Sequence, residues 1–258
     1  MRILISPAKK MNVDTDTLSP AGLPVFLEET EEILKWMRTL GFQEAKELWG
    51  CNEKIAKLNF ERISAMELRR GLTPALLSYE GIQYQYMAPS VFEEGQYEYV
   101  QEHLRILSGF YGILKPMDGV TPYRLEMQAK AGPQGKKDLY DFWGDRLYRE
   151  ALDESRILIN LASKEYAKCI EKYLGSQDVY LTCVFGEYAD GKVRQKGTYA
   201  KMARGEMVRF LAENRVESPQ GLKDFDRLGY RFCGELSKED TYVFIKQPSG
   251  QDETSFRA

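Results

Sequence analysis

The sequence predicts a mixed α/β fold in a single domain that covers residues 1–258. Single hydrophobic cores stop growing at about 250–300 residues, so a chain of this length fits one large domain. Hydrophobic residues make up 43% of the chain, which is enough apolar material to offset the entropy of ordering it. Apolar runs typical of buried strands alternate with amphipathic helical segments, without a strict βαβ rhythm or a dividing linker.

The N-terminal part of the chain predicts two strands and two helices. The apolar run at 2–5 predicts a buried strand. Apolar residues at helical spacing predict a helix at 28–40, and acidic residues occupy its first turn, where the helix dipole favours them. A second helix is expected at 53–68. The segment 75–79 predicts another strand, closed at Gly81.

The middle of the chain predicts a helix followed by a tight glycine connection. Apolar residues at helical spacing indicate a helix at 96–107, with Gly109 placed to end it. Gly109 and Gly112 then resemble the hairpin of a helix-hairpin-helix motif, in which backbone N–H groups approach a phosphate. Two residues separate these glycines, whereas the usual hairpin has one between them.

The C-terminal half predicts a strand-rich region with two helices. Ser163 is the expected N-cap of the first of these helices. The Asp190-Gly191 pair predicts a β-hairpin between two strands. The expected strands are 156–161, 179–188, 192–195 and 242–246, and the expected helices are 164–173 and 198–215.

The rarest residue types argue against several kinds of site. The chain has one histidine, His103, and four cysteines, none of which lies in a C-x-x-C pair. One imidazole rules out a histidine-rich metal site, and a cysteine site would need all four scattered thiols to converge. We therefore expect no metal and no cofactor, haem and iron–sulfur clusters included. His103 is either a histidine that is packed or at the solvent edge, or a catalytic one.

The hydropathy and charge of the chain bound its location and partners. No apolar run approaches the roughly 18–20 residues that span a bilayer, and the apolar stretch at 3–5 is too short for a signal peptide. We therefore expect a cytosolic protein without a membrane partner. The formal net charge of -3 argues against general affinity for nucleic acid but is compatible with a local basic patch.

Polar side chains mark the ends of two of the expected strands. Ser6 and Lys9 follow the strand at 2–5, and Asn160 and Ser163 close the strand at 156–161. Ligands of α/β sheets bind beyond the carboxyl ends of strands, and a helix that begins near Ser163 adds free N–H groups. We expect the two strands to be neighbours, so that these four residues form an anion pocket. The alternative is that Ser163 only caps its helix and Lys9 is only solvated.

Arg124 and Glu126 are the candidate third wall of this pocket. They lie two residues apart in a segment that we expect to be extended, so both side chains point to one face. They form either a substrate-binding pair or an internal salt bridge.

The strongest local charge signal lies at 190–215. This segment holds seven basic and three acidic side chains, a balance of +4 in an acidic protein. Four of the basic residues share an arc of about 140° on a helical wheel: Lys201, Arg204, Arg209 and Arg215. This face either contacts the phosphate backbone of nucleic acid or is a solvated charged face.

Six stretches, in order along nearly the whole chain, resemble the YaaA family of bacterial peroxide-stress proteins. The resemblance implies a protein that limits oxidative damage under hydroperoxide stress by lowering free intracellular iron. It also implies a single-domain α/β architecture called the cannon fold, with a helix-hairpin-helix element, a basic cleft and DNA binding. The stretches are Ile-Ser-Pro-Ala-Lys (5–9), His-Leu-Arg-Ile-Leu-Ser-Gly-Phe-Tyr-Gly-Ile-Leu-Lys-Pro (103–116), Pro-Tyr-Arg-Leu-Glu-Met (122–127), Leu-Tyr-Asp-Phe-Trp-Gly-Asp (139–145), Ile-Asn-Leu-Ala-Ser-Lys-Glu-Tyr (159–166) and Tyr-Ala-Lys-Met-Ala-Arg-Gly-Glu-Met-Val-Arg-Phe (199–210).

Two main functions are compatible with these observations, and a structural or scaffold role, with the basic helix serving a protein partner, is a third. The first is a DNA-binding protein of the peroxide stress response, with double-stranded or branched DNA as its partner. The second is an enzyme that acts on a small anionic, nucleotide or nucleic-acid substrate in the strand-end pocket, although no catalytic signature is present. By motif position and charge, the expected DNA-binding residues are Ser108, Gly109, Gly112, Lys115, Lys201, Arg204, Arg209 and Arg215.

Overall fold

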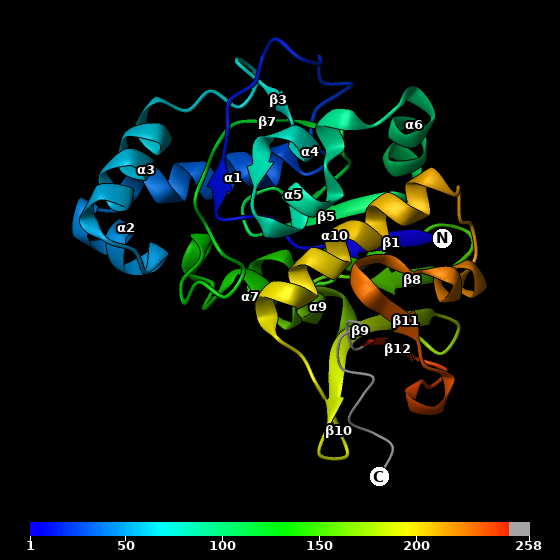
Figure 1. Cartoon of the computed structure of the whole chain (residues 1–258). Helices are drawn as coiled ribbons and strands as arrows, with labels where there is room; N and C mark the ends of the chain where they lie inside the picture. Colours follow the sequence, from blue (N-terminus) through cyan, green and yellow to red (C-terminus); the bar gives the residue numbers. More distant parts are fainter. Residues whose placement is uncertain (248–258) are drawn as a thin grey trace.

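A mostly parallel sheet forms the centre of the computed structural model, which describes residues 1–247 (Figure 1). Its five central strands run parallel in the order β12-β9-β8-β1-β5, and antiparallel strands β11 and β6 flank them. The strands are β1 (Arg2–Ile5), β5 (Leu104–Ser108), β6 (Gly112–Leu114), β8 (Ile157–Asn160), β9 (Val179–Ala189), β10 (Lys192–Arg194), β11 (Tyr230–Phe232) and β12 (Thr241–Lys246). The mixed α/β fold expected from the sequence is confirmed.

The innermost strands β1, β5 and β8 are short, apolar and almost fully buried, as expected for parallel strands covered on both faces. Leu4 pairs with Asn160 on β8 and with Arg105 on β5. Because β1 and β8 are adjacent and parallel, their carboxyl ends meet at the same edge of the sheet. The prediction that these two strands are neighbours in the sheet is therefore confirmed.

Helices pack around the sheet, and two short antiparallel strand pairs lie outside it (Figure 1). Within residues 1–247, none of the helices has both the length and the apolar character needed to cross a bilayer. The α-helices are α1 (Leu27–Thr39), α2 (Phe42–Trp49), α3 (Glu53–Ala65), α4 (Ala75–Ser78), α5 (Ile82–Met87), α6 (Glu94–His103), α7 (Leu139–Trp143), α8 (Arg146–Ala151), α9 (Lys164–Glu171) and α10 (Gly197–Glu213). The short pairs are β2 (Lys10–Met11) with β4 (Tyr79–Glu80), and β3 (Thr73–Pro74) with β7 (Gly119–Val120).

Several predicted elements agree with this structure to within a few residues. The helices expected at 28–40, 53–68, 164–173 and 198–215 are α1, α3, α9 and α10. The hairpin predicted at Asp190-Gly191 joins β9 to β10, and both residues have the positive φ that its turn requires. The helix α2 has no counterpart among the predicted elements.

Two predicted elements are wrong. Ala75–Ser78 is a single helical turn rather than a strand, because the N–H groups of Ala75 and Leu76 bond the distant carbonyls of Asp118 and Pro116. The helix expected at 96–107 ends at His103, and Leu104–Ser108 continues as strand β5 between β1 and β6. Both segments are short apolar runs whose periodicity fits a helix as well as a strand, so their contacts with distant segments determine which secondary structure they adopt.

The glycine connection after β5 is a buried β-turn and not the hairpin of a helix-hairpin-helix motif. It joins the antiparallel strands β5 and β6, and the Ser108 hydroxyl accepts N–H bonds from Phe110 and Tyr111 at 3.2 and 2.9 Å. Ser108, Gly109 and Gly112 are all buried, so they present no surface to a phosphate. The expected DNA-contacting role of these three residues is therefore corrected to a structural one.

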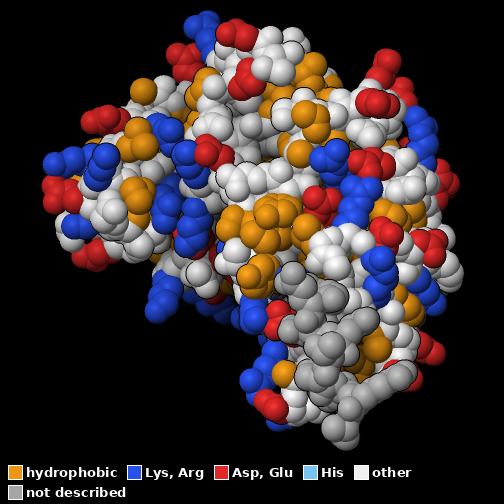
Figure 2. Space-filling view, viewed as in Figure 1, with side chains coloured by type: hydrophobic (Ala, Val, Ile, Leu, Met, Phe, Trp, Pro, Cys, Tyr) orange, Lys and Arg blue, Asp and Glu red, His pale blue; other side chains and the backbone are white. Residues whose placement is uncertain are grey.

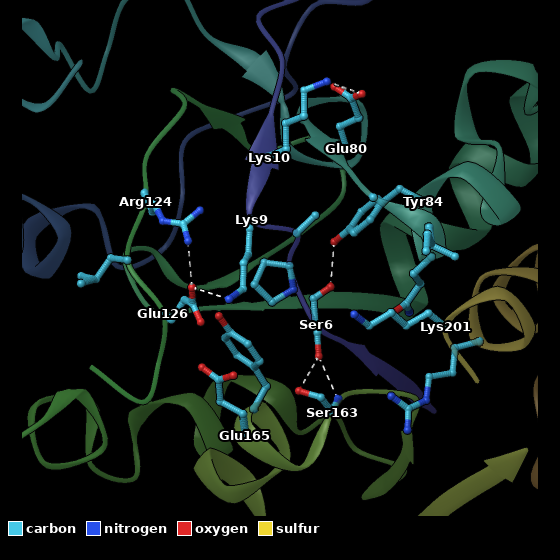
Figure 3. Close-up of a pocket in the computed structure, with 18 of the residues that line it drawn as sticks. Ser6, Lys9, Lys10, Glu80, Tyr84, Arg124, Glu126, Ser163, Glu165 and Lys201 are labelled. Atoms are coloured by element: carbon cyan, nitrogen blue, oxygen red, sulfur yellow. Dashed lines mark hydrogen bonds and ion pairs between the residues drawn. The ribbon is translucent and has the colours of Figure 1, made fainter. Parts of the chain in front are cut away.

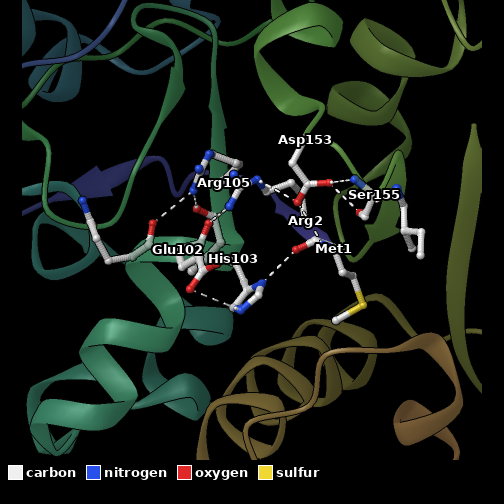
Figure 4. Close-up of polar contacts among 10 residues, drawn as sticks. Met1, Arg2, Glu102, His103, Arg105, Asp153 and Ser155 are labelled. Atoms are coloured by element: carbon white, nitrogen blue, oxygen red, sulfur yellow. Dashed lines mark hydrogen bonds and ion pairs between the residues drawn. The ribbon is translucent and has the colours of Figure 1, made fainter.

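A polar cluster closes the opposite end of β1 (Figure 4). The amino group of Met1 pairs with the carboxylate of Asp153 at 2.9 Å, and the Met1 carbonyl contacts Nδ1 of His103 at 2.9 Å. His103 is 8% exposed and its ring lies 4.4 Å from that of Tyr99. Of the two alternatives for this histidine, the structure supports packing.

The contact between α10 and α5 depends on one glycine. Gly205 is buried on the face of α10 that meets α5, so the two helix backbones approach directly (Figure 1). A Cβ at this position would overlap the carbonyl oxygen of Gln83 and lie 2.9 Å from the backbone nitrogen of Met87. Neither of these backbone atoms can move without displacing α5.

We predict that Gly205→Ala destabilises the protein by at least about 2 kcal/mol, because overpacking against backbone outweighs the gain in helix propensity. The matched control is Gly197→Ala at the start of the same helix, where a Cβ meets no atom within 4 Å. Urea unfolding of both variants measures the difference. Equal stabilities for the two variants would contradict the close helix contact.

Candidate functional site

A cavity of about 480 Å³ opens beyond the carboxyl ends of β1 and β8 (Figure 3). Five segments far apart in the sequence line it, and α10 closes one side. In Figure 3, Lys9, Arg124 and Glu126 lie on one side, Lys201 lies on the other, and Ser6 and Ser163 lie between them. The lining segments are 6–10, 80–84, 123–126, 163–166 and the part of α10 that carries Lys201 and Arg204.

The floor of the cavity is a contact between two serines. The Ser163 N–H donates to the Ser6 hydroxyl at 2.8 Å, and that hydroxyl lies 3.3 Å from the hydroxyl of Ser163. Ser163 occupies the N-cap position of α9, as predicted, but its side chain accepts no bond from the helix. Its hydroxyl instead contacts Ser6. Tyr84 fixes the same turn by donating its hydroxyl proton to the Ser6 carbonyl at 3.0 Å.

The third wall carries an ion-pair network on one carboxylate. Glu126 Oε1 lies 2.8 Å from Lys9 Nζ and 3.5 Å from Arg124 Nη2. The Arg124 side chain is 11% exposed, whereas the Lys9 side chain is 66% exposed. Arg124 and Glu126 share one face, as the extended segment predicts, and they both form an ion pair and line the cavity.

The turn at 108–112 holds this third wall in place. Ser108 Oγ lies 2.6 Å from the hydroxyl of Tyr123, which lines the cavity and also contacts the Tyr79 hydroxyl at 2.8 Å. A Cβ at Gly109 would lie 2.7 Å from the carbonyl oxygen of Leu125, so the wall packs directly on the glycine. Ser108 and Gly109 do not line the cavity themselves, but they hold in place the segment 123–126 that does.

The predicted basic face of α10 is divided by the structure. Lys201 and Arg204 line the cavity, and within residues 1–247 neither forms an ion pair. Arg209 pairs with Glu213 at 2.7 Å, and Arg215, beyond the helix end, pairs with Glu98 at 3.6 Å. Basic and acidic side chains are interspersed over this second half of the helix in Figure 2. Of the four basic residues, the first two therefore line the cavity and the last two are paired with carboxylates, and their predicted contact with phosphate stays a prediction.

The cavity carries a positive balance in a negatively charged protein. Five basic and three acidic side chains line it, a balance of +2 against the net charge of -3 for the chain. Burial lowers the pKa of the Arg204 guanidinium, whose Nε has no hydrogen-bond partner within the described residues. The Nε2 amide nitrogen of Gln83, which is 7% exposed and lines the cavity, also lacks a partner there. The positive balance of the lining suits an anionic ligand.

One carboxyl group in the cavity is perturbed. Burial raises the pKa of Glu165, and the nearby Glu126 carboxylate raises it further, while the N–H of Gln128 opposes the shift. Burial also raises the pKa values of Tyr84, Tyr123 and Tyr166 in the cavity wall, so these phenols stay protonated. In the described part of the chain, no group of three His, Cys, Asp or Glu side chains is placed to hold a metal ion.

Comparison with known proteins assigns the chain to a named family. The sequence profile described as "Peroxide stress protein YaaA" matches residues 1–236. The chain belongs to this family. It is similar to a UPF0246 protein of Agathobacter rectalis, with 62% identity over 96% of this chain and 99% of the relative. It is also similar to UPF0246 proteins of Lachnoclostridium phytofermentans (56% identity, 96% and 98% covered) and Desulfitobacterium hafniense (53% identity, 95% and 98% covered).

In this member of the YaaA family, one predicted pocket residue points elsewhere. The Asn160 side chain is 3% exposed and does not line the cavity. Its Oδ1 accepts the N–H of Ala162 at 2.9 Å, and its Nδ2 donates to the Thr182 hydroxyl at 3.3 Å. Asn160 therefore shapes the turn that delivers Ser163. Lys115, also predicted as a DNA contact, is exposed and lies outside the cavity lining.

The prediction from sequence missed three charged residues of the cavity: Lys10, Glu80 and Glu165. Lys10 and Glu80 face each other across the β2–β4 pair, with 2.6 Å between Nζ and Oε1. Their positions just beyond predicted strands were a usable signal, because such positions gather at ligand sites.

We predict a large and a small stability effect for two residues that the sequence grouped together. Asn160→Ala should cost about 1–3 kcal/mol, because it leaves the buried Ala162 N–H without an acceptor. Lys9→Ala should change stability by less than about 1 kcal/mol, since it removes only an exposed ion pair. Chemical denaturation of both variants tests this. A similar loss in both would show that Lys9 is also structural.

Proposed function

We propose that this chain acts in the peroxide stress response by binding the phosphate groups of nucleic acid in the strand-end cavity. One observation carries the proposal: Lys201 and Arg204, which have no ion-pair partner within residues 1–247, face the serine turns at the ends of β1 and β8. Cations without carboxylate partners, together with hydroxyl and amide donors, are the groups that bind phosphate.

The expected ligand is double-stranded or branched DNA. The two cations of the cavity that have no ion-pair partner within residues 1–247 both lie on α10, so a phosphate enters between α10 and the turn at 6–10. The paired residues Arg209 and Arg215 are expected to contribute less, because binding a phosphate there would compete with Glu213 and Glu98. Lowering of free intracellular iron belongs to the same proposal, as a consequence of the nucleic-acid interaction rather than of direct ligation.

We predict that Lys201→Ala combined with Arg204→Ala weakens DNA binding at least about tenfold and reduces the slope of log affinity against log salt by about 2. The loss should be similar for DNA of different sequences, because phosphate contacts carry no base identity. Fluorescence anisotropy with labelled duplex and branched DNA, measured over a range of salt concentrations, provides both quantities.

The matched control removes two positive charges from the other half of the same segment, with Arg209→Ala and Arg215→Ala. Both double variants have the same net charge, so a general electrostatic effect would weaken them equally. An equal loss would therefore contradict binding at the cavity. Chelatable iron in cells that carry each variant measures the iron-lowering part of the proposal separately.

A second candidate function is an enzyme that acts on an anionic or nucleotide substrate in the same cavity. The observation that favours it is the carboxyl pair Glu126 and Glu165, of which Glu165 has a raised pKa. A carboxyl group that titrates closer to neutral pH is suited to general acid or base catalysis. Glu165 is the candidate for that role.

We predict that sulfate binds more tightly as the pH falls toward the ordinary carboxyl value of 4.5. The raised pKa means that Glu165 takes up its proton above that value, which removes one negative charge from the anion site. Sulfate keeps its charge over this pH range, so a change in its affinity reflects protonation of the protein and not of the ligand. Isothermal titration of the wild type and of Glu165→Gln measures it. The variant should bind sulfate more tightly at neutral pH and lose most of the pH dependence; an unchanged profile would exclude Glu165 as the titrating group.

A further inference from the structure

A second hollow of about 840 Å³ adjoins the cavity on the side of α1 and α2. It lies between the segments 36–50 and 126–131, and Lys9 and Glu126 line both hollows. We call it the tryptophan groove, defined by Trp36, Leu40, Glu44, Glu47, Leu48, Trp49 and the segment 128–131. The ion pair between Lys9 and Glu126 therefore stands at the boundary between the cavity and the groove.

The groove differs from the cavity in chemistry. Trp36, Leu40 and Leu48 are half-buried and give it an aromatic and aliphatic surface, with the buried Trp49 beside them. Three acidic and two basic side chains line it, a balance of -1, whereas the cavity has a balance of +2. The exposed carboxylates of Glu44 and Glu47 lie at its edge. The two adjoining hollows thus suit a ligand with one anionic end and one flat, neutral end.

We propose that the tryptophan groove binds an unpaired nucleobase of a nucleotide whose phosphate occupies the cavity. This inference rests on the proposed function, because the base in the groove and the phosphate in the cavity belong to the same nucleotide. Bases stack on tryptophan whatever their identity, and carboxylates accept hydrogen bonds from the amino groups of bases. Trp36 supplies the stacking surface, and Glu44 and Glu47 supply the acceptors.

The occupant is an unpaired base rather than a base pair. In a duplex, both faces of a base are stacked and its pairing edge is used, so it cannot lie against Trp36 and offer its amino groups to the groove. Single strands, the open bases of branched DNA and free nucleotides share the required chemistry. An apolar peptide segment would also fit the surface of the groove, but it would leave the adjoining cluster of cations without an anion.

The test compares two ligands with the same phosphates. One is a short single-stranded oligodeoxynucleotide labelled at its end, and the other is an abasic phosphodiester chain of the same length. The base-bearing strand should bind at least about fivefold more tightly, the lower limit for one stacked base. It should also quench tryptophan fluorescence, because two of the three tryptophans lie in the groove, and the third, Trp143, is buried elsewhere. A nucleoside monophosphate tested in parallel distinguishes free nucleotide from strand.

Variants assign the effect to the groove. Trp36→Ala should remove the advantage of the base-bearing strand and leave the affinity for the abasic chain unchanged, while Trp36→Phe should retain most of it. Tyr188→Ala, at an aromatic residue that is 55% exposed on β9, is the control and should change neither affinity.

The possible outcomes separate this inference from the proposed function. Equal binding of the two ligands without quenching would overturn the base site and leave phosphate binding in place. Binding of neither ligand would overturn both. A base preference that survives Trp36→Ala in a folded variant would place the base outside the groove and overturn the assignment. Because the two ligands are compared on the wild-type protein, the inference is tested even if a variant fails to fold.

Discussion

The parallel pairing of β1 with β8 is the constraint on which the site depends. It brings the turns at Ser6 and Ser163 to one edge of the sheet, where the Ser163 N–H bonds the Ser6 hydroxyl at 2.8 Å. The start of α9 is thereby fixed beside the turn that carries Lys9. Asn160 stabilises the same arrangement from inside, since its amide holds the backbone between β8 and α9. The floor of the cavity is therefore part of the core of the sheet.

Two further packing contacts complete the walls of the cavity. The backbone contact at Gly205 places α10 on α5, and this position brings Lys201 and Arg204 over the strand ends. The turn at 108–112 supports the opposite wall through the Ser108–Tyr123 hydrogen bond. The fold also determines which basic residues are paired. Acidic side chains pair with Arg209 and Arg215, whereas Lys201 and Arg204 at the cavity have no ion-pair partner among the described residues. An anionic ligand is thus directed to one place.

Local sequence patterns could predict part of this arrangement because they act over short distances. The apolar runs of β1 and β8, the Asp190-Gly191 turn and the amphipathic α10 all have periodicity or turn chemistry that does not depend on distant residues. Ser6, Lys9 and Ser163 were found from their positions at strand ends, and Arg124 and Glu126 from their spacing in an extended segment. All five line one cavity. The hairpin at 108–112 was misjudged because Leu104 and Leu107 fit helical spacing as well as a buried strand.

The sequence by itself determined the fold class, the family and the edge of the sheet where polar groups gather, because strand length, apolar content and motif order are properties of the chain. Only the tertiary structure decided which cations of α10 have an ion-pair partner among the described residues. Lys201, Arg204, Arg209 and Arg215 look equivalent on a helical wheel, yet the last two meet carboxylates that the fold brings to them. The same holds for Trp36 and Lys9, which lie 27 residues apart and line one groove. Such pairings depend on how distant segments pack, and packing is specified by the whole core at once.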